Sequence, residues 1–136
     1  MNRSDYDAYL RAFNARDYDA VLAHFAEPFE LVFAGYVFRT KEEVRRFYEF
    51  LHAYVAESVT VHSFVSDGRM VALDADVRLE GLADLTPELL AERGLERIVP
   101  IGRGQVVTIP QFIHYHLDGE GRIVRALCAV YEPPHA

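Results

Sequence analysis

The chain has 136 residues, 51% of them hydrophobic, and a formal net charge of −7. Its length fits one domain spanning 1–136, and its apolar content is too high for a disordered chain. The acidic balance argues against nucleic acid and against anionic membrane surfaces, because both need clustered Lys and Arg. The N-terminus has no apolar segment of signal-peptide type, and no apolar run reaches the roughly 18 residues of a membrane-spanning helix. We therefore expect a cytoplasmic protein.

Two short helices are predicted at the start of the chain. Ser4 can cap the first helix, and Asp17 can cap the second. Pro28 is expected to end the second helix, because proline cannot continue a helical backbone. The apolar side chains that recur at helical spacing in the first helix are Tyr6, Tyr9, Leu10 and Phe13.

A short strand pair and a long helix are expected next. The strands are 29–33 and 36–39, and residues 40–43 (Thr-Lys-Glu-Glu) form a capping box that begins the helix. The apolar face of this helix consists of Val44, Phe47, Tyr48, Leu51 and Val55. His52 is expected on its exposed flank.

From residue 58 onward the hydrophobic period is two, which indicates half-buried strands. Two strands, 58–66 and 70–80, meet at an Asp-Gly turn, and two more, 104–117 and 122–131, meet at the turn 118–121. Helices followed by an antiparallel meander predict an α+β fold, with helices packed on one face of a curved antiparallel sheet. The tail at 132–136 is expected to fray.

The segment 82–102 is longer than a hairpin connection requires. Pro87 begins a short helix in it, and Gly94 ends that helix. Long insertions in compact domains are often lids or interface elements. The hydrophobic side chains that can cover a pocket mouth are Leu85, Leu89, Leu90, Leu95 and Ile98. The alternative is a surface helix that the same leucines anchor.

The order of these segments resembles the nuclear transport factor 2-like superfamily, in particular its SnoaL-like and ketosteroid isomerase-like members. Residues 9–19 and 24–27 are similar to the ends of the first two helices of that family. Residues 40–48 are similar to the start of its third helix, and 117–123 to its last hairpin. The resemblance covers nearly the whole chain except 82–102.

This resemblance implies a cone-shaped sheet wrapped around the long helix and the two N-terminal helices, enclosing a conical pocket for a small hydrophobic molecule. It also implies a homodimer formed through the outer sheet face. The side chains expected to contact the ligand are Phe13, Phe33, Tyr48, Leu73, Gln111, Ile113, Tyr115, Ala126 and Cys128. Small side chains on neighbouring strands favour a cavity over a filled core.

Tyr9 is the candidate catalytic residue, since it matches the tyrosine that holds an oxyanion in ketosteroid isomerases. The alternative is an amphipathic core tyrosine. The two acids of that family are missing, because its general base falls near Phe33 and its protonated carboxylic acid falls at Ile113. Glu30, the nearest carboxylate, is expected to face solvent. The steroid-isomerase mechanism is therefore not expected.

Two histidines lie at alternate positions on the strand 104–117. If Ile113 and Tyr115 face the pocket, then His114 and His116 face outward. Asp74 and Asp76 also face outward, on the neighbouring strand. These two aspartates and the two histidines are therefore candidates for cross-strand pairs, for a metal site or for a pH-sensitive dimer surface. A register shift of one residue would instead place both histidines in the pocket, where His62 could join them.

Two functions remain open from the sequence. The first is a cofactor-independent isomerase, dehydratase or polyketide cyclase-like enzyme acting on a small hydrophobic carbonyl or phenolic compound. Tyr9 would orient or polarise the substrate, with Gln111, Tyr115 and, in the alternative register, a histidine assisting. The second is a non-catalytic ligand-binding or dimerisation domain, which the missing acids favour. Neither a cofactor nor a resident metal is expected. His24 is expected to be a buried structural residue, and Cys128 a small buried side chain.

Overall fold

A six-stranded sheet, in the order β2-β1-β6-β5-β4-β3, organises the protein. The computed structural model describes residues 1–131, and the tail at 132–136 that was predicted to fray lies outside them. The elements in chain order are α1 (Arg3–Asn14), α2 (Tyr18–Leu22), β1 (Phe25–Phe33), β2 (Tyr36–Phe38), α3 (Lys41–Tyr54), β3 (Val55–Ser66), β4 (Met70–Gly81), α4 (Pro87–Glu92), β5 (Val106–Leu117) and β6 (Ile123–Val130).

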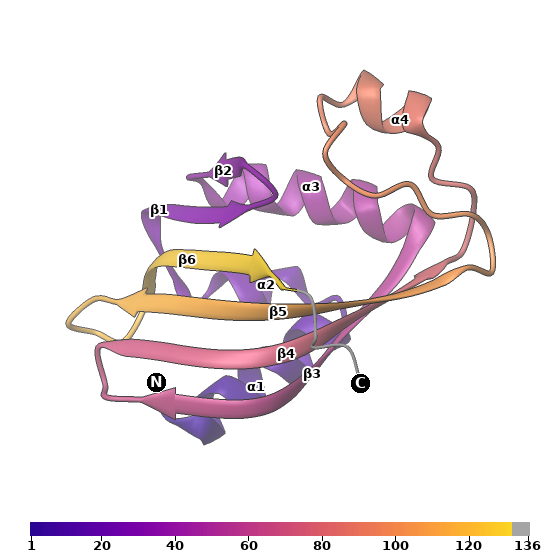
Figure 1. Ribbon diagram of the computed structural model, residues 1–136. Helices are drawn as coiled ribbons and strands as arrows, with labels where there is room; N and C mark the ends of the chain where they lie inside the picture. Colours follow the sequence, from indigo (N-terminus) through magenta and orange to yellow (C-terminus); the bar gives the residue numbers. More distant parts are fainter. Residues whose placement is uncertain (132–136) are drawn as a thin grey trace.

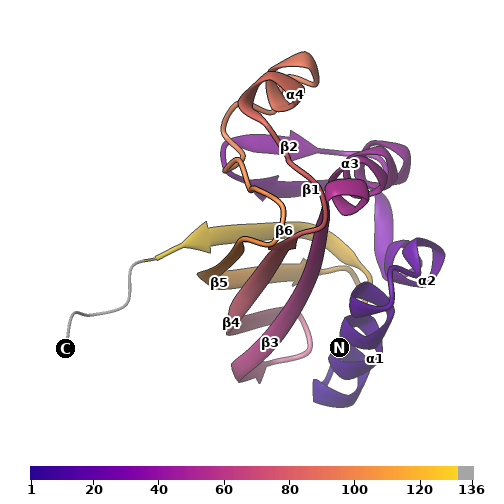
Figure 2. The ribbon, with the colours of Figure 1, turned by 90° about the vertical axis from the view of Figure 1, so that its right-hand side faces the viewer.

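The helices α1, α2 and α3 cover one face of this curved sheet, while α4 projects beyond it (Figures 1 and 2). Neighbouring strands are antiparallel, except that β1 pairs with β6 in parallel. The predicted α+β class with a curved sheet is confirmed, with one parallel pair in place of an entirely antiparallel sheet.

The helix starts follow the predicted caps at two of three positions. Asp17 and Thr40 cap α2 and α3. The cap of α1 is Asn2 rather than Ser4. The Asn2 side chain accepts a hydrogen bond from the backbone amide of Asp5, and the Asp5 carboxylate accepts one from the backbone amide of Asn2. The prediction for Pro28 was wrong, since α2 ends earlier and Pro28 lies within β1.

Two hydrophobic cores lie on the covered face. The first packs α1 and α2 against the sheet, and the second packs α3 against the 82–102 segment. That segment folds back on itself, because Leu85 and Ile101 exchange backbone hydrogen bonds of 2.9 and 3.2 Å. Gly81 permits this return, since a Cβ there would lie 2.0 Å from the carbonyl oxygen of Gly102. The insertion is therefore anchored to the long helix.

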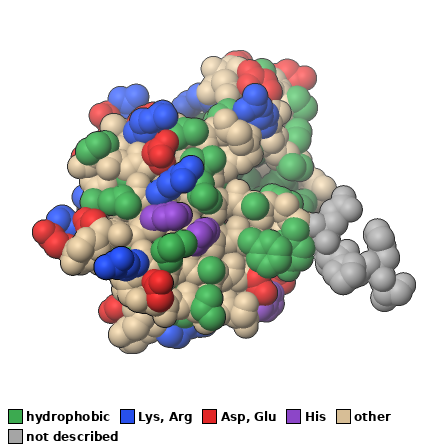
Figure 3. All heavy atoms as spheres, turned by 60° about the vertical axis from the view of Figure 1, so that its left-hand side comes forward, with side chains coloured by type: hydrophobic (Ala, Val, Ile, Leu, Met, Phe, Trp, Pro, Cys, Tyr) green, Lys and Arg blue, Asp and Glu red, His purple; other side chains and the backbone are tan. Residues whose placement is uncertain are grey.

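The parity predicted for β5 is confirmed. Ile113 and Tyr115 are buried on the covered face, while His114 and His116 lie on the outer face with their rings 4.7 Å apart. Figure 3 shows histidine side chains side by side on this face, between basic and hydrophobic side chains. Phe112, 53% exposed, lies on the same face. The alternative in which the histidines line the pocket is wrong.

The predicted array of two histidines opposite two aspartates was wrong. His114 and His116 pair with Ala72 and Met70 on β4, and Asp76 instead bonds His62 of β3 at 2.9 Å. A tight turn fixes the register of a hairpin, but the connection between β4 and β5 is the long insertion. The faces of these strands could therefore be predicted from local alternation, whereas the pairing of individual residues across them could not.

Candidate functional site

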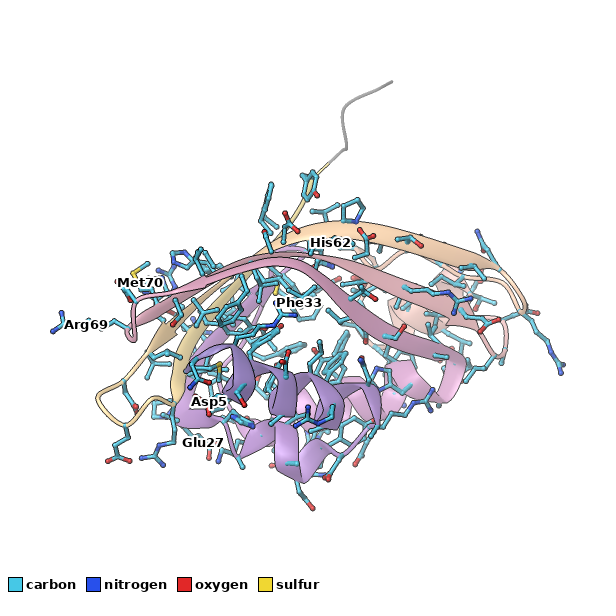
Figure 4. The ribbon with its side chains drawn as sticks, turned by 90° about the horizontal axis from the view of Figure 1, so that it is seen from below. Asp5, Glu27, Phe33, His62, Arg69 and Met70 are labelled. Atoms are coloured by element: carbon cyan, nitrogen blue, oxygen red, sulfur yellow. The ribbon has the colours of Figure 1, made fainter. Side chains whose placement is uncertain are left out.

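A cavity of about 370 Å³ lies between the sheet and the helices α1 and α3. This volume falls in the range of small-molecule sites. Its walls come from both cores, and most of the lining side chains are apolar. Phe33 lies between the sheet and the helices in Figure 4, whereas His62 lies on the opposite, outer side of the sheet.

Eight of the side chains singled out from the sequence line this cavity. They are Tyr9, Phe13, Phe33, Tyr48, Gln111, Ile113, Tyr115 and Cys128. Leu73 and Ala126 are instead buried in the first core, packed with side chains of α1 and α2, and are not among the described residues that line the cavity. Both side chains are enclosed by this packing, so they present no surface to the cavity.

Phenol groups converge at the inner end of the cavity. The hydroxyls of Tyr6 and Tyr115 lie 3.4 Å apart, and the ring of Tyr9 stacks on Tyr6 with centroids 5.5 Å apart. Burial raises the pKa of Tyr6 to about 12, and it raises the pKa of Tyr9 and of Tyr115 as well. These hydroxyls therefore stay protonated near neutral pH and can donate hydrogen bonds to an oxygen of a bound molecule. Tyr9 is both a core tyrosine and a cavity-lining one.

Glu57, which the sequence analysis did not single out, brings a carboxylate into this apolar cavity. It lies near the start of β3, with its side chain 12% exposed. Its Oε1 lies 2.8 Å from Nε2 of His52, and Nδ1 of His52 lies 2.7 Å from the hydroxyl of Tyr18. In the neutral imidazole with its proton on Nε2, Tyr18 donates to Nδ1 and Nε2 donates to the carboxylate. These three groups form a hydrogen-bonded chain that ends at the cavity.

The prediction that His52 is exposed was wrong, since its side chain is 3% exposed. The helix α3 runs directly into β3 at Val55, and the connection from α1 to α2 covers that junction. In this connection Arg16 donates to the carbonyl oxygens of His52 and Val55 at 3.1 and 3.4 Å. One sequence signal was available, because His52 lies four residues after Tyr48 and so shares its buried face.

Burial disfavours the thiolate of Cys128, which is the nucleophilic form of the side chain. Burial, with the negative charge of Glu57 as a second cause, raises its pKa to about 12. The same two effects raise the pKa of Tyr48. The cavity therefore brings the carboxyl group of Glu57, bonded to His52, together with several phenols that burial keeps protonated near neutral pH. This combination can accept a proton from a bound molecule while stabilising charge on its oxygen.

The mouth of the cavity is marked by its exposed lining residues, which are Ala34, Arg97, Val99 and Val130. Two of them belong to the 82–102 insertion, as do the lining residues Ile98 and Ile101. The leucines at 85, 90 and 95, which were candidates to cover the pocket mouth, are instead buried in the second core. The insertion thus combines anchoring leucines with a stretch that borders the mouth.

None of the histidines among residues 1–131 lines the cavity itself. His24 is half-buried with its ring edge-on to Tyr9 at 5.3 Å, and burial lowers its pKa. Among residues 1–131, no group of three His, Cys, Asp or Glu side chains is arranged to hold a metal ion. None of the helices described is both long enough and apolar enough to cross a membrane.

Comparison with known proteins gives the family. The model of the SnoaL-like domain matches residues 6–126. The chain belongs to the SnoaL-like domain family. Among curated proteins, none matches the sequence.

Solved structures share the fold of this SnoaL-like protein. A candidate polyketide cyclase of Pseudomonas putida KT2440 is 24% identical over 93% of this chain and 88% of its own, with a TM-score of 0.69. An NTF2-like protein of unknown function from Burkholderia pseudomallei K96243 is 15% identical over 96% and 92%, with a TM-score of 0.71. An LEH-like epoxide hydrolase of M. tuberculosis is 16% identical over 93% and 79%, with a TM-score of 0.67. At these identities the likeness establishes the fold alone.

Proposed function

We propose that this SnoaL-like protein binds a small hydrophobic carbonyl or phenolic compound in its cavity and catalyses a cofactor-independent proton transfer, in an isomerisation, dehydration or cyclisation. The observation that carries the proposal is the Glu57 carboxylate in the apolar cavity, bonded to His52 at 2.8 Å. Solved proteins of the same fold include candidate polyketide cyclases, which supports a small organic substrate.

The proposed step uses Glu57 as the general base. Its carboxylate removes a proton from the carbon next to a carbonyl group, and the electron pair of the broken C–H bond forms the enolate. The phenols of Tyr9 and Tyr115 donate hydrogen bonds to the enolate oxygen. His52 and Tyr18 are positioning residues, because they fix the carboxylate without reaching the substrate.

Hydrogen–deuterium exchange of a probe ketone tests this proposal. 2-Tetralone is an apolar bicyclic ketone, and the exchange of its α-protons in D₂O is followed by proton NMR. We expect the protein to accelerate exchange and Glu57→Gln to reduce the acceleration at least about 100-fold, since general-base catalysis is typically worth that much. Glu49→Gln is the matched control, because Glu49 is an exposed side chain on α3.

A non-catalytic ligand-binding domain is the second candidate. The observation in its favour is that Phe33 and Ile113, at the positions of the two acids of ketosteroid isomerases, are apolar. If 2-tetralone binds but its exchange is not accelerated, this second candidate is correct and Glu57 is not a base. Native mass spectrometry of freshly purified protein would then report the molecule that the cavity retains.

We also propose that the protein is a homodimer formed through the outer sheet face. The exposed side chains of Phe112 and Met70 and the His114–His116 pair support this. Sedimentation at micromolar concentration tests it, with Phe112→Glu expected to give the monomer. A wild-type monomer would contradict it. The cytoplasmic location stays a prediction.

A further inference from the structure

Arg97, in the 82–102 insertion, is held at the mouth of the cavity by uncharged acceptors. Its backbone amide donates to the hydroxyl of Tyr36 at 2.9 Å, and its Nη1 donates to the carbonyl oxygen of Gly35 at 3.2 Å. The guanidinium also lies over the ring of Tyr36, 5.7 Å from its centroid. These contacts fix the cation on the turn between β1 and β2, beside the cavity that it lines.

The position of the guanidinium depends on glycine at residue 35. A Cβ there would lie 2.3 Å from Nη1 of Arg97, so any larger residue would displace the guanidinium. Gly35 also has a φ of +81°, which other residues rarely adopt. The turn therefore holds the guanidinium of Arg97 in one position, which a long and flexible side chain would not adopt without these contacts.

The charge of Arg97 is not neutralised by a side chain of the described residues. None of the ion pairs formed within residues 1–131 includes it. The other charged side chain among the described residues that line the cavity is Glu57, whose Oε1 is bonded to His52. The mouth thus carries a cation, and the walls leading inward from it are mainly apolar.

We infer that the ligand of this cavity is a small organic acid, with its apolar body inside and its carboxylate on Arg97 at the mouth. The inference rests on the proposed binding of a small hydrophobic molecule and specifies its chemical class. A guanidinium donates two parallel hydrogen bonds to a carboxylate, which makes the pair geometrically selective. The net charge of −7 repels acids at long range, so the selection must arise from this contact.

Displacement of a neutral fluorescent probe tests the inference. N-phenyl-1-naphthylamine reports occupancy of an apolar cavity, and 2-naphthoate and 2-naphthamide compete for it with the same ring system but with and without charge. We expect 2-naphthoate to displace the probe at about tenfold lower concentration than the amide, since a charge-assisted pair contributes about 1.4 kcal/mol or more. Arg97→Gln should abolish this preference, and Arg97→Lys should retain part of it.

Arg103→Gln is the matched control. Arg103 is exposed near the same segment and does not line the cavity, so this variant changes the net charge equally and should keep the preference. Equal displacement by the two compounds in the wild type, or a preference that survives Arg97→Gln, overturns the inference alone. If the neutral probe does not bind the wild type, both the proposed function and the inference fail. Melting temperatures of the variants verify that each is folded.

Discussion

The hydrogen-bonded chain from Tyr18 through His52 to Glu57 makes a strong prediction for the substitution His52→Phe. Both ring nitrogens of His52 are bonded, at 2.7 and 2.8 Å, and the side chain is 3% exposed. A buried group that loses its partner cannot recover the lost bond from water. The substitution should therefore destabilise the protein substantially.

The expected loss of stability follows from the contacts of His52 that a phenylalanine ring would keep and the hydrogen bonds that it would lose. The ring of His52 stacks on Tyr48 and Tyr18 at centroid distances of 5.2 and 5.8 Å, and a phenyl ring can preserve this packing. The bond to the carboxylate of Glu57 is worth roughly 2 kcal/mol, and the bond to the hydroxyl of Tyr18 about 1 kcal/mol. We expect a loss of about 3 kcal/mol, or a fall in Tm of about 10 °C.

Urea unfolding followed by circular dichroism measures this loss, with His62→Phe as the control. His62 pairs with Asp76 at 2.9 Å, but the two side chains are 49% and 38% exposed. An exposed pair contributes little, so the control should change the free energy of unfolding by about 0.5 kcal/mol or less. Equal effects of the two substitutions would refute the buried chain and remove the basis for Glu57 as a positioned base.

Three further predictions test the burial and packing of the same region. Because burial raises the pKa of Tyr6 from 10.0 to about 12, its contribution to stability is full below pH 10 and is lost as the pH rises through 12, so the urea midpoint should fall between pH 10 and 12. Alkylation of Cys128 by iodoacetamide at pH 8 should be at least about 100-fold slower than in the urea-unfolded chain, and Glu57→Gln should accelerate it by removing the charge that raises the thiol pKa. Gly81→Ala should cost about 2–3 kcal/mol in thermal unfolding, since its Cβ would lie 2.0 Å from a backbone oxygen, whereas Gly119→Ala, with open space around it, should cost little.

The sequence predicted the fold because local patterns and fold agree over most of the chain. Alternation along β4 and β5 matches the buried and exposed faces of these strands, and the capping box at Thr40 begins α3 where expected. The register of β4 against β5 was not predictable, because no tight turn joins the two strands. The histidines of β5 therefore drew attention to a metal site that their neighbours, Ala72 and Met70, do not support.

The residues that line the cavity were predicted better than its hydrogen-bonded acid–base group, because only the former follow from local periodicity. The lining residues alternate along single strands or helices, so their positions follow from local periodicity. The contact between His52 and Glu57 instead spans the junction where α3 becomes β3, and neither the helical nor the strand period extends across that junction. Glu57 follows Val55 at strand spacing and so shares its covered face, but the strand predicted from the sequence begins at residue 58 and does not include Glu57.

Apolar side chains on two walls also limit where chemistry can occur in this cavity. Phe33 packs on Phe47 with centroids 5.1 Å apart, and Ile113 is buried in the first core, so neither wall can supply a proton acceptor. His114 lies on the other side of the sheet and cannot reach a ligand from there. Among the described residues that line the cavity, Glu57 supplies the only carboxylate, so the proposed proton abstraction depends on it. For this reason one conservative substitution, Glu57→Gln, which keeps the shape and the acceptor for His52, separates an enzyme from a binding protein.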